Sequence, residues 1–187
     1  QDPLDVSGMQ KLRELIVRNN ALSYLTVRDC PALETIEMYS NYVRELDLTG
    51  CVSLRYLNCT WNRLQTLDLS GLTKLETVYC GYNGGFHDGT ITSVKANGCT
   101  ALTTLNCYGN SITELELTGC SSLTELDCGG NYLASLDLSG CPALTVLGCS
   151  INPLTAPLDL SAVPALEVLY LERYPMERID LSRVPAL

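Results

Sequence analysis

Leucines recur along the chain at a nearly constant interval, and each is followed by the same order of apolar and polar positions. The first leucines of successive copies are Leu12, Leu33, Leu54, Leu75, Leu102, Leu123, Leu144, Leu166 and Leu187. The intervals between them are 21, 21, 21, 27, 21, 21, 22 and 21 residues. A fixed period of this size predicts a solenoid, in which each copy forms one coil and packs on its neighbours.

Within one copy, apolar and polar residues alternate over the stretch from Thr104 to Tyr108. Alternation with a period of two is typical of a strand, so we expect Leu105 and Cys107 to point inward and Asn106 and Tyr108 outward. Eight stacked copies then give one parallel sheet of eight strands. The rest of each copy contains LDLSG or a near equivalent, too short and too rich in turn formers for an ordinary helix. We expect short extended or 3₁₀ segments there.

Each copy reads LxxLxCxxNxLxxLDLSGCxx, which resembles the leucine-rich repeat family and its hallmark LxxLxL/CxxNxL. The 21-residue form with cysteine is most similar to the internalin group and to related repeat proteins of Bacteroidetes-type bacteria. The resemblance implies a curved, right-handed solenoid with the sheet on its concave face. It also implies a non-catalytic binding module that is secreted or held at a bacterial cell surface. Length and repeats predict a single domain over residues 1–187.

An asparagine stands at the corner where the chain must leave each strand. These residues are Asn20, Asn41, Asn62, Asn83, Asn110, Asn131 and Asn152. A buried amide can bond backbone groups that the bend leaves unpaired, in its own coil and in the next. We therefore expect a structural role for this column.

The ten cysteines fall in two columns of the repeat. Cys59, Cys80, Cys107, Cys128 and Cys149 take an inward strand position, and Cys30, Cys51, Cys99, Cys120 and Cys141 follow the Gly-bearing turn. Other apolar residues replace them one at a time, whereas a disulfide would tend to lose both partners together. This pattern favours free thiols packed in the core over disulfides. Zinc is a weaker alternative, since no ligand spacing of the usual kind is present, and we expect no metal or cofactor.

Charge excludes one class of partner. The chain has 12 Lys+Arg against 21 Asp+Glu, a net charge of -9, and no Lys or Arg lies between Ala96 and Glu172. The basic footprint of a nucleic-acid binder is therefore absent. No apolar run approaches the roughly 20 residues that span a bilayer, so we expect no membrane span. Carboxylates at Glu37, Glu125, Asp127 and Glu172 favour a neutral or positive partner, or form a solvated acidic surface.

Aromatic residues gather at the positions that face outward from the predicted sheet or follow it. The predicted ligand-binding residues are Tyr39, Tyr56, Trp61, Tyr79, Tyr82, Tyr108, Tyr132, Tyr170 and His87. Tyr39, Tyr56, Tyr79, Tyr108 and Tyr170 are placed on strands, and the other aromatics around the strand exit. Glycines at 81, 109, 129, 130 and 148 are expected to leave hollows between the rings. Such a face suits a protein or a glycan equally well, although the rings can also simply stabilise the sheet.

One copy is longer than the others over residues 84–90, and this insertion holds His87 beside Asp88. It predicts a surface loop or a contact loop, while catalysis by this pair is disfavoured because no nucleophile signature accompanies it. Both ends of the sequence fall within a repeat, which favours a longer parent protein or an end-to-end dimer. The alternative functions are a structural spacer and the recognition arm of an enzyme whose catalytic domain lies elsewhere.

Overall fold

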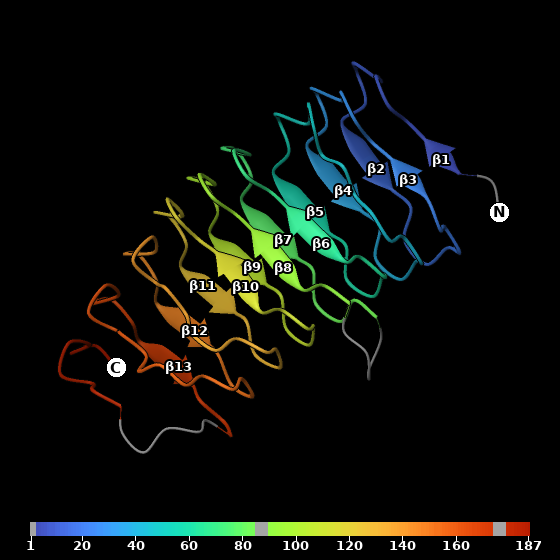
Figure 1. The fold of residues 1–187 in the computed structure, drawn as a ribbon. Coiled ribbons are helices and arrows are strands. Elements are labelled where there is room, and N and C mark those ends of the chain that lie inside the picture. The colour runs from blue at the N-terminus through green and yellow to red at the C-terminus, as the bar shows by residue number, and fades with distance from the viewer. Residues whose placement is uncertain (1–2, 85–89, 174–178) are drawn as a thin grey trace.

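The computed structural model describes residues 3–84, 90–173 and 179–187. The chain forms an elongated stack of coils that runs from the N-terminus to the C-terminus (Figure 1). One strand of each coil joins a parallel sheet of eight strands, hereafter the main sheet. Its members in spatial order are β2 (Glu14–Ile16), β4 (Thr35–Glu37), β5 (Tyr56–Asn58), β7 (Thr77–Tyr79), β9 (Thr104–Asn106), β11 (Glu125–Asp127), β12 (Val146–Gly148) and β13 (Val168–Tyr170). The predicted repeat solenoid with a parallel sheet is confirmed.

Further strands form a second layer from the other part of the coils. Three of them, β6 (Thr66–Asp68), β8 (Ser93–Lys95) and β10 (Glu114–Glu116), make a parallel sheet. Two more, β1 (Leu4–Asp5) and β3 (Leu25–Thr26), pair with each other. The predicted extended segments are therefore present, whereas neither 3₁₀ nor α-helix occurs in the described ranges. None of those residues accordingly belongs to a helix that could cross a membrane.

The middle residue of each main-sheet strand points into the stack. Leu169 occupies this position in β13 and is half-buried. The buried residues at this position in the other strands are Leu15, Ile36, Leu57, Val78, Leu105, Leu126 and Leu147. Neighbouring strands pair in register, so Leu105 stands beside Val78 on one side and Leu126 on the other. The apolar column of one coil thus continues that of the next, and the core is continuous along the stack.

The corner asparagines bond backbone groups of two coils at once. The Nδ2 group of Asn131 donates to the Cys128 carbonyl at 3.0 Å and to the Cys107 carbonyl of the preceding coil at 3.1 Å. Its Oδ1 atom accepts from the Ile112 N–H at 3.0 Å. Asn41, Asn62, Asn83, Asn110 and Asn152 are buried with equivalent bonds. The structural role predicted for the column is confirmed for these residues, while Asn20 is exposed and bonds only within its own coil.

All ten cysteines are free and buried, so the free-thiol interpretation is confirmed over disulfides. The thiols of Cys30, Cys51, Cys99 and Cys120 each donate to a carbonyl of the preceding coil, as Cys51 does to Val27 at 3.0 Å. Burial raises the pKa of the Cys59 thiol to about 12, and it raises those of the other strand-column cysteines too. These groups therefore stay neutral at physiological pH and are poor nucleophiles.

The aspartates of the LDL segments close turns on the side away from the main sheet. Asp137 Oδ1 accepts from the Ser139 N–H at 2.9 Å, and Asp5, Asp47, Asp68, Asp159 and Asp180 repeat the bond in their own coils. These bonds hold the pKa of Asp137 below its ordinary value, because they favour the ionised carboxylate. The aspartates thus have a local structural role.

Candidate functional site

The outward positions of the main sheet and the residues that follow its strands form the candidate surface. Tyr56, Tyr79 and Tyr170 lie on β5, β7 and β13, as predicted. Tyr39 and Tyr108 were also expected on strands, and this placement is wrong, because β4 ends at Glu37 and β9 at Asn106. They still lie beside the sheet, since the backbone after each strand bonds the next coil, as the Cys107 N–H does with the Asp127 carbonyl at 2.8 Å.

The residue before each corner asparagine has a left-handed backbone. The φ angle is 53° at Asn19, 59° at Ser40, 55° at Trp61, 52° at Tyr82, 70° at Gly109, 62° at Gly130 and 56° at Ile151. Arg173 takes the same place in the last copy, which has no corner asparagine, and its φ angle is 51°. Glycine and asparagine adopt this conformation readily, whereas a large side chain is strained in it. Trp61 and Tyr82 are therefore held at a position that the backbone alone would give to a smaller residue.

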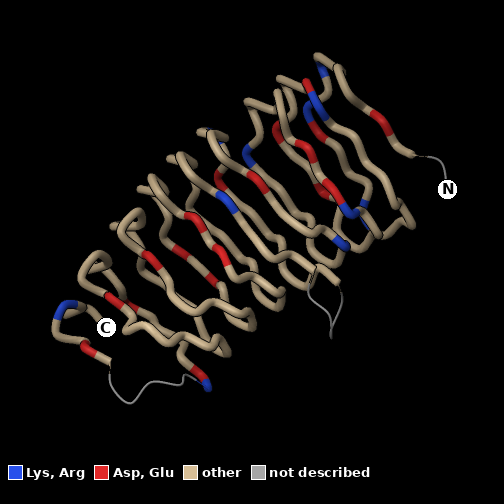
Figure 2. The backbone as a smooth tube through the Cα atoms, viewed as in Figure 1, with Lys and Arg blue, Asp and Glu red and all other residues tan. Residues whose placement is uncertain are grey.

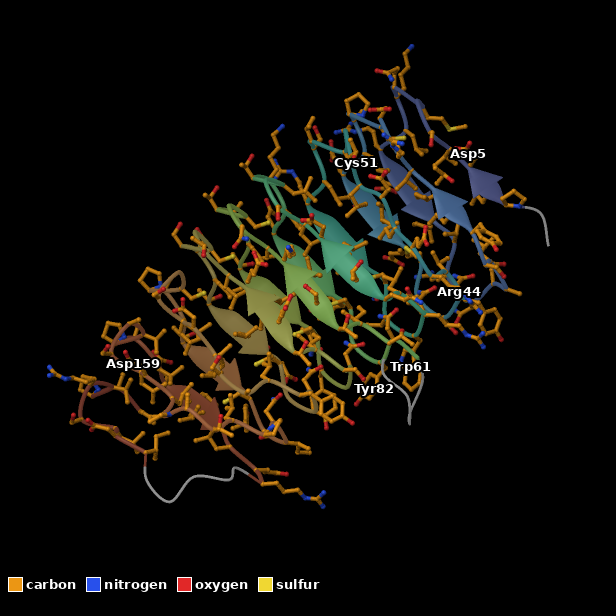
Figure 3. All side chains as sticks on the ribbon, in the orientation of Figure 1. Asp5, Arg44, Cys51, Trp61, Tyr82 and Asp159 are labelled. Atoms are coloured by element: carbon orange, nitrogen blue, oxygen red, sulfur yellow. The ribbon has the colours of Figure 1, made fainter. Side chains whose placement is uncertain are left out.

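Three rings form a continuous row along the edge where the strands end, hereafter the aromatic edge (Trp61, Tyr82 and Tyr108). Trp61 and Tyr82 stack with ring centroids 4.8 Å apart and planes inclined by 12°. Tyr82 and Tyr108 are 5.5 Å apart and tilted by 56°. Figure 3 shows the Trp61 and Tyr82 side chains next to each other at this edge. Each ring is half-buried, so part of its surface is open to a partner.

The remaining tyrosines are more dispersed. Tyr56 and Tyr79 lie 6.1 Å apart on neighbouring strands of the main sheet. Tyr132 and Tyr170 are exposed, and Tyr39 is half-buried. The structure thus unites Trp61, Tyr82 and Tyr108 in one cluster and Tyr56 with Tyr79 in a second. The predicted site residue His87 and its neighbour Asp88 lie outside the described residues.

A hollow of about 390 Å³ opens beside the aromatic edge, between Tyr42 and Trp61. Asn19, Asn20 and Ser40 line it with exposed polar side chains. Arg63 forms its other wall and places its guanidinium 4.8 Å from the centre of the Tyr42 ring. The edge therefore offers aromatic surface next to hydrogen-bonding groups.

Four of the predicted hollows between the rings do not exist, and at Gly81 an added Cβ would stand 2.9 Å from the Tyr108 carbonyl oxygen. A Cβ added to Gly109 would stand 2.9 Å from the Tyr82 ring, and one added to Gly129 would stand 3.0 Å from the Tyr108 ring. Gly130 lies under the same tyrosine, and a Cβ added to it would stand 3.4 Å from the Cζ atom of Tyr108. At these last three glycines the prediction was wrong because each ring lies along the stack and covers the glycine of the next coil. Sequence alignment of the copies contains the signal, since Gly129 follows Tyr108 by one period.

Above Gly148 a hollow does exist, with a volume of about 250 Å³, hereafter the acidic hollow. Its walls include Tyr108, Glu125, Asp127, Tyr170 and Glu172. Asp127 lies partly over the glycine, with its Oδ1 atom 3.0 Å from the position that a Cβ would take. Burial raises the pKa of Asp127, and the nearby charge of Glu125 raises it further, although the Gly129 N–H donates to this carboxylate at 3.1 Å.

Charge is distributed unevenly along the stack (Figure 2). Toward the N-terminus, carboxylates pair with cations of a neighbouring coil, as Glu34 does with Arg13 at 2.6 Å and Glu37 with Arg18 at 2.9 Å. The other pairs are Arg28–Asp47, Arg55–Glu76 and Lys95–Glu116. In the described part of the chain no cation pairs with the carboxylates of the acidic hollow. The predicted acidic face therefore divides into a neutralised part and an uncompensated part.

Comparison with known proteins supports the repeat assignment. Residues 100–140 match the family model of leucine rich repeats in two copies. No curated protein sequence matches the chain. The chain is similar to the functional domain of InlJ from Listeria monocytogenes, described as including a cysteine ladder, with 26% identity and a TM-score of 0.58. This match covers 99% of the present chain and 49% of that chain.

Two further solved structures share the coil. YopM from Yersinia enterocolitica has 27% identity and a TM-score of 0.56, over 86% of this chain and 37% of that chain. A leucine-rich repeat protein of Leptospira interrogans has 20% identity and a TM-score of 0.73, over 95% and 48%, which shows the fold alone. The chain spans half or less of each of these structures. The chain thus has the fold of a leucine-rich repeat solenoid, and its repeat pattern and its column of buried thiols are similar to the cysteine-containing repeats of internalin type.

Proposed function

We propose that the chain is a non-catalytic recognition module that binds a protein or a glycan through the main sheet and the aromatic edge. The observation that carries this proposal is the left-handed backbone at Trp61 and Tyr82. The same corner takes glycine at 109 and 130, and it also takes Ile151 and Arg173, so a large residue there carries a conformational cost wherever it occurs. Trp61 and Tyr82 are distinguished by standing in neighbouring coils with stacked rings. Their stacking offsets part of that cost, by about 0.5–1.5 kcal/mol. A binding role explains the remainder.

The dimensions of the surface support a macromolecular partner. Eight strands at about 4.8 Å spacing give a sheet roughly 34 Å long, which can present a specific footprint. Half-exposed tryptophan and tyrosine are the residues that most often dominate binding energy at interfaces. The hollow beside Trp61, with exposed amide and hydroxyl groups, would equally accept a sugar ring against an aromatic face.

A secreted or surface location in a bacterium is part of the same proposal. It is supported by the similarity to repeat domains from Listeria and Yersinia.

Among the described residues, no group of three or more His, Cys, Asp or Glu side chains could hold a metal ion. A larger parent protein could add an activity of its own, in which case the present module would supply its recognition.

The test is binding of the purified chain to paired glycan and extracellular-protein arrays. Trp61→Ser and Tyr82→Gly are combined in one variant, because other coils already carry serine or glycine at this corner. Tyr24→Ser is the matched control, since Tyr24 is exposed and lies beside β3, in the second layer. The proposal expects a hit that the double variant loses and the control keeps. If both variants still bind the ligand, the binding site lies outside the aromatic edge. If no ligand is found on either array, a role as a structural spacer is favoured.

A further inference from the structure

The acidic hollow is too small for a whole ligand of ordinary size. Its volume is about 250 Å³, whereas pockets for small molecules occupy about 300–1,000 Å³. A space below that range suits one long side chain projecting from a larger partner. It exists because position 148 is glycine, so β12 contributes no side chain between Asp127 on β11 and Tyr170 on β13.

The charge of the hollow favours a cation. Glu125, Asp127 and Glu172 line it, and none of them has a cationic partner among the residues described. On the same face Glu37 is paired with Arg18, so an ion pair is what this surface forms where a cation is in reach. Asp127 is partly buried, and a cation arriving there would replace the hydration that burial has removed.

The aromatic walls favour the guanidinium of arginine over the ammonium of lysine. Tyr108 stands on the β9 side of the hollow and Tyr170 on the β13 side. A guanidinium is planar, stacks on aromatic rings and bonds two carboxylate oxygens at once, whereas an ammonium is a compact and strongly hydrated point charge. A hollow with both rings and carboxylates matches the guanidinium in each respect.

We propose that the acidic hollow is the socket for an arginine side chain of a protein partner. The proposal rests on the proposed function and narrows it, because it selects a protein with a basic segment over a glycan. The arginine would lie over Gly148, pair with Asp127 and Glu125, and stack against the tyrosines. Its neighbours along the partner chain would then contact the main sheet toward the aromatic edge.

The test is an NMR titration of the ¹⁵N-labelled chain at low ionic strength with the peptide acetyl-Gly-Gly-Arg-Gly-Gly-amide. The expected result is a shift of the Gly148 and Ser150 amide resonances. A citrulline peptide has the same shape without the charge, and its affinity should be lower by a factor of about ten or more. Glu125→Gln and Gly148→Val should each cause a comparable loss, the first by removing a charge and the second by filling the space. Glu114→Gln is the matched control, since Glu114 lies exposed on β10 in the second layer.

Equal binding of the arginine and citrulline peptides would overturn the proposal, as would unchanged binding to Glu125→Gln. A lysine peptide that binds as tightly as the arginine peptide would overturn the assignment to arginine. Preserved dispersion of the amide spectrum checks that Gly148→Val is folded, and Glu125→Gln keeps the test decisive if it is not. An array hit lost on changing Trp61 and Tyr82, with no peptide binding, would refute the socket alone. Peptide binding without any array hit would instead refute the aromatic edge as the recognition site.

Discussion

The ring of Tyr108 lies across the backbone of Gly129 in the next coil, so that a Cβ on this glycine would stand 3.0 Å from the Cδ2 atom of the ring. The contact joins two coils through a side chain that is also part of the aromatic edge. It fixes the direction of the ring, which runs along the stack instead of outward from it. The surface offered to a partner is therefore set by a glycine that the partner would not need to touch.

Replacement of Gly129 by alanine should destabilise the chain by about 1–3 kcal/mol, because the new methyl group would collide with the Tyr108 ring. The φ angle of Gly129 is not left-handed, so the effect is steric. In a Tyr108→Ala background the same substitution should cost clearly less, and urea unfolding of all four proteins gives the coupling energy. Additive costs would show that the ring and the glycine do not constrain each other.

Asn131→Ala should cost more than about 3 kcal/mol, because it leaves two buried carbonyls and one buried N–H without their partner. Asn20→Ala is the matched control, since Asn20 is exposed and water can replace its bonds. Its cost should stay below about 1 kcal/mol. Urea unfolding measures both variants, and similar costs would refute the role assigned to the two-coil bonds.

Because of its buried thiols, the chain should lose stability at alkaline pH. The native pKa of Cys59, Cys99 and Cys141 is about 12, against an ordinary value of 9.0. Because the folded chain keeps these protons more firmly than the unfolded chain, the stabilisation is complete below pH 9 and is lost as the pH rises toward 12. The thermal midpoint should therefore fall over this window.

The same burial predicts that a thiol reagent labels the chain slowly at pH 8 and labels all ten cysteines in urea. Mass spectrometry counts the labels in each condition. Rapid labelling of the native chain would show that coils open locally far more often than the core packing implies.

Asp127→Asn should raise the thermal midpoint at pH 7. The native pKa of Asp127 is raised by burial, so its ionisation weakens the fold as the pH rises, and the amide removes this penalty. The amide oxygen can still accept from Gly129, as the Asn106 side chain in the preceding coil does from Tyr108 at 3.2 Å. The long bond from Asn106 Nδ2 to Asp127 Oδ2, at 3.4 Å, is lost and reduces the gain. The gain should vanish in acid, where the native carboxyl is already protonated.

Asp137→Asn is the control of opposite sign. The pKa of Asp137 is lowered by the bond from Ser139, so its charge stabilises the fold above the ordinary carboxyl pKa and this contribution is lost in acid. The amide should lower the midpoint at pH 7. A loss with Asp127→Asn as well would show that the hydrogen bonds to this carboxylate stabilise its charge more than burial destabilises it.

The coil was predictable because each feature of it recurs in every copy. Leu105 points inward, Asn131 bonds two coils and Cys107 is a free buried thiol, each as its column in the repeat implied. Repetition supplies several independent observations of one local structure. The packing of a side chain into its own coil is therefore well determined by sequence alone.

The surface was less predictable because it depends on contacts between one particular coil and the next. The tilt of Tyr108 toward Gly129 and the ion pair of Arg18 with Glu37 each occur once. The left-handed backbone of Trp61 leaves no trace in its own residue type, and shows only through Asn19 and the glycines at the same place in other coils. The gap at Gly148 was predicted correctly, and so were the carboxylates on this face. The acidic hollow is predicted only when the gap and the carboxylates are considered together.

The insertion leaves the asparagine bonds unbroken. Asn62 reaches back 24 residues to the Met38 carbonyl, and Asn110 makes the same bond to Cys80 across 30 residues, at 2.9 Å and 3.0 Å respectively. The Asn110 Oδ1 atom also accepts from the Asn83 N–H, so hydrogen bonds connect the coil before the insertion with the coil after it. Chain length between these coils is thus decoupled from the framework. Segments of other lengths and sequences could be exchanged there, as in a display scaffold, while the neighbouring coils keep their geometry.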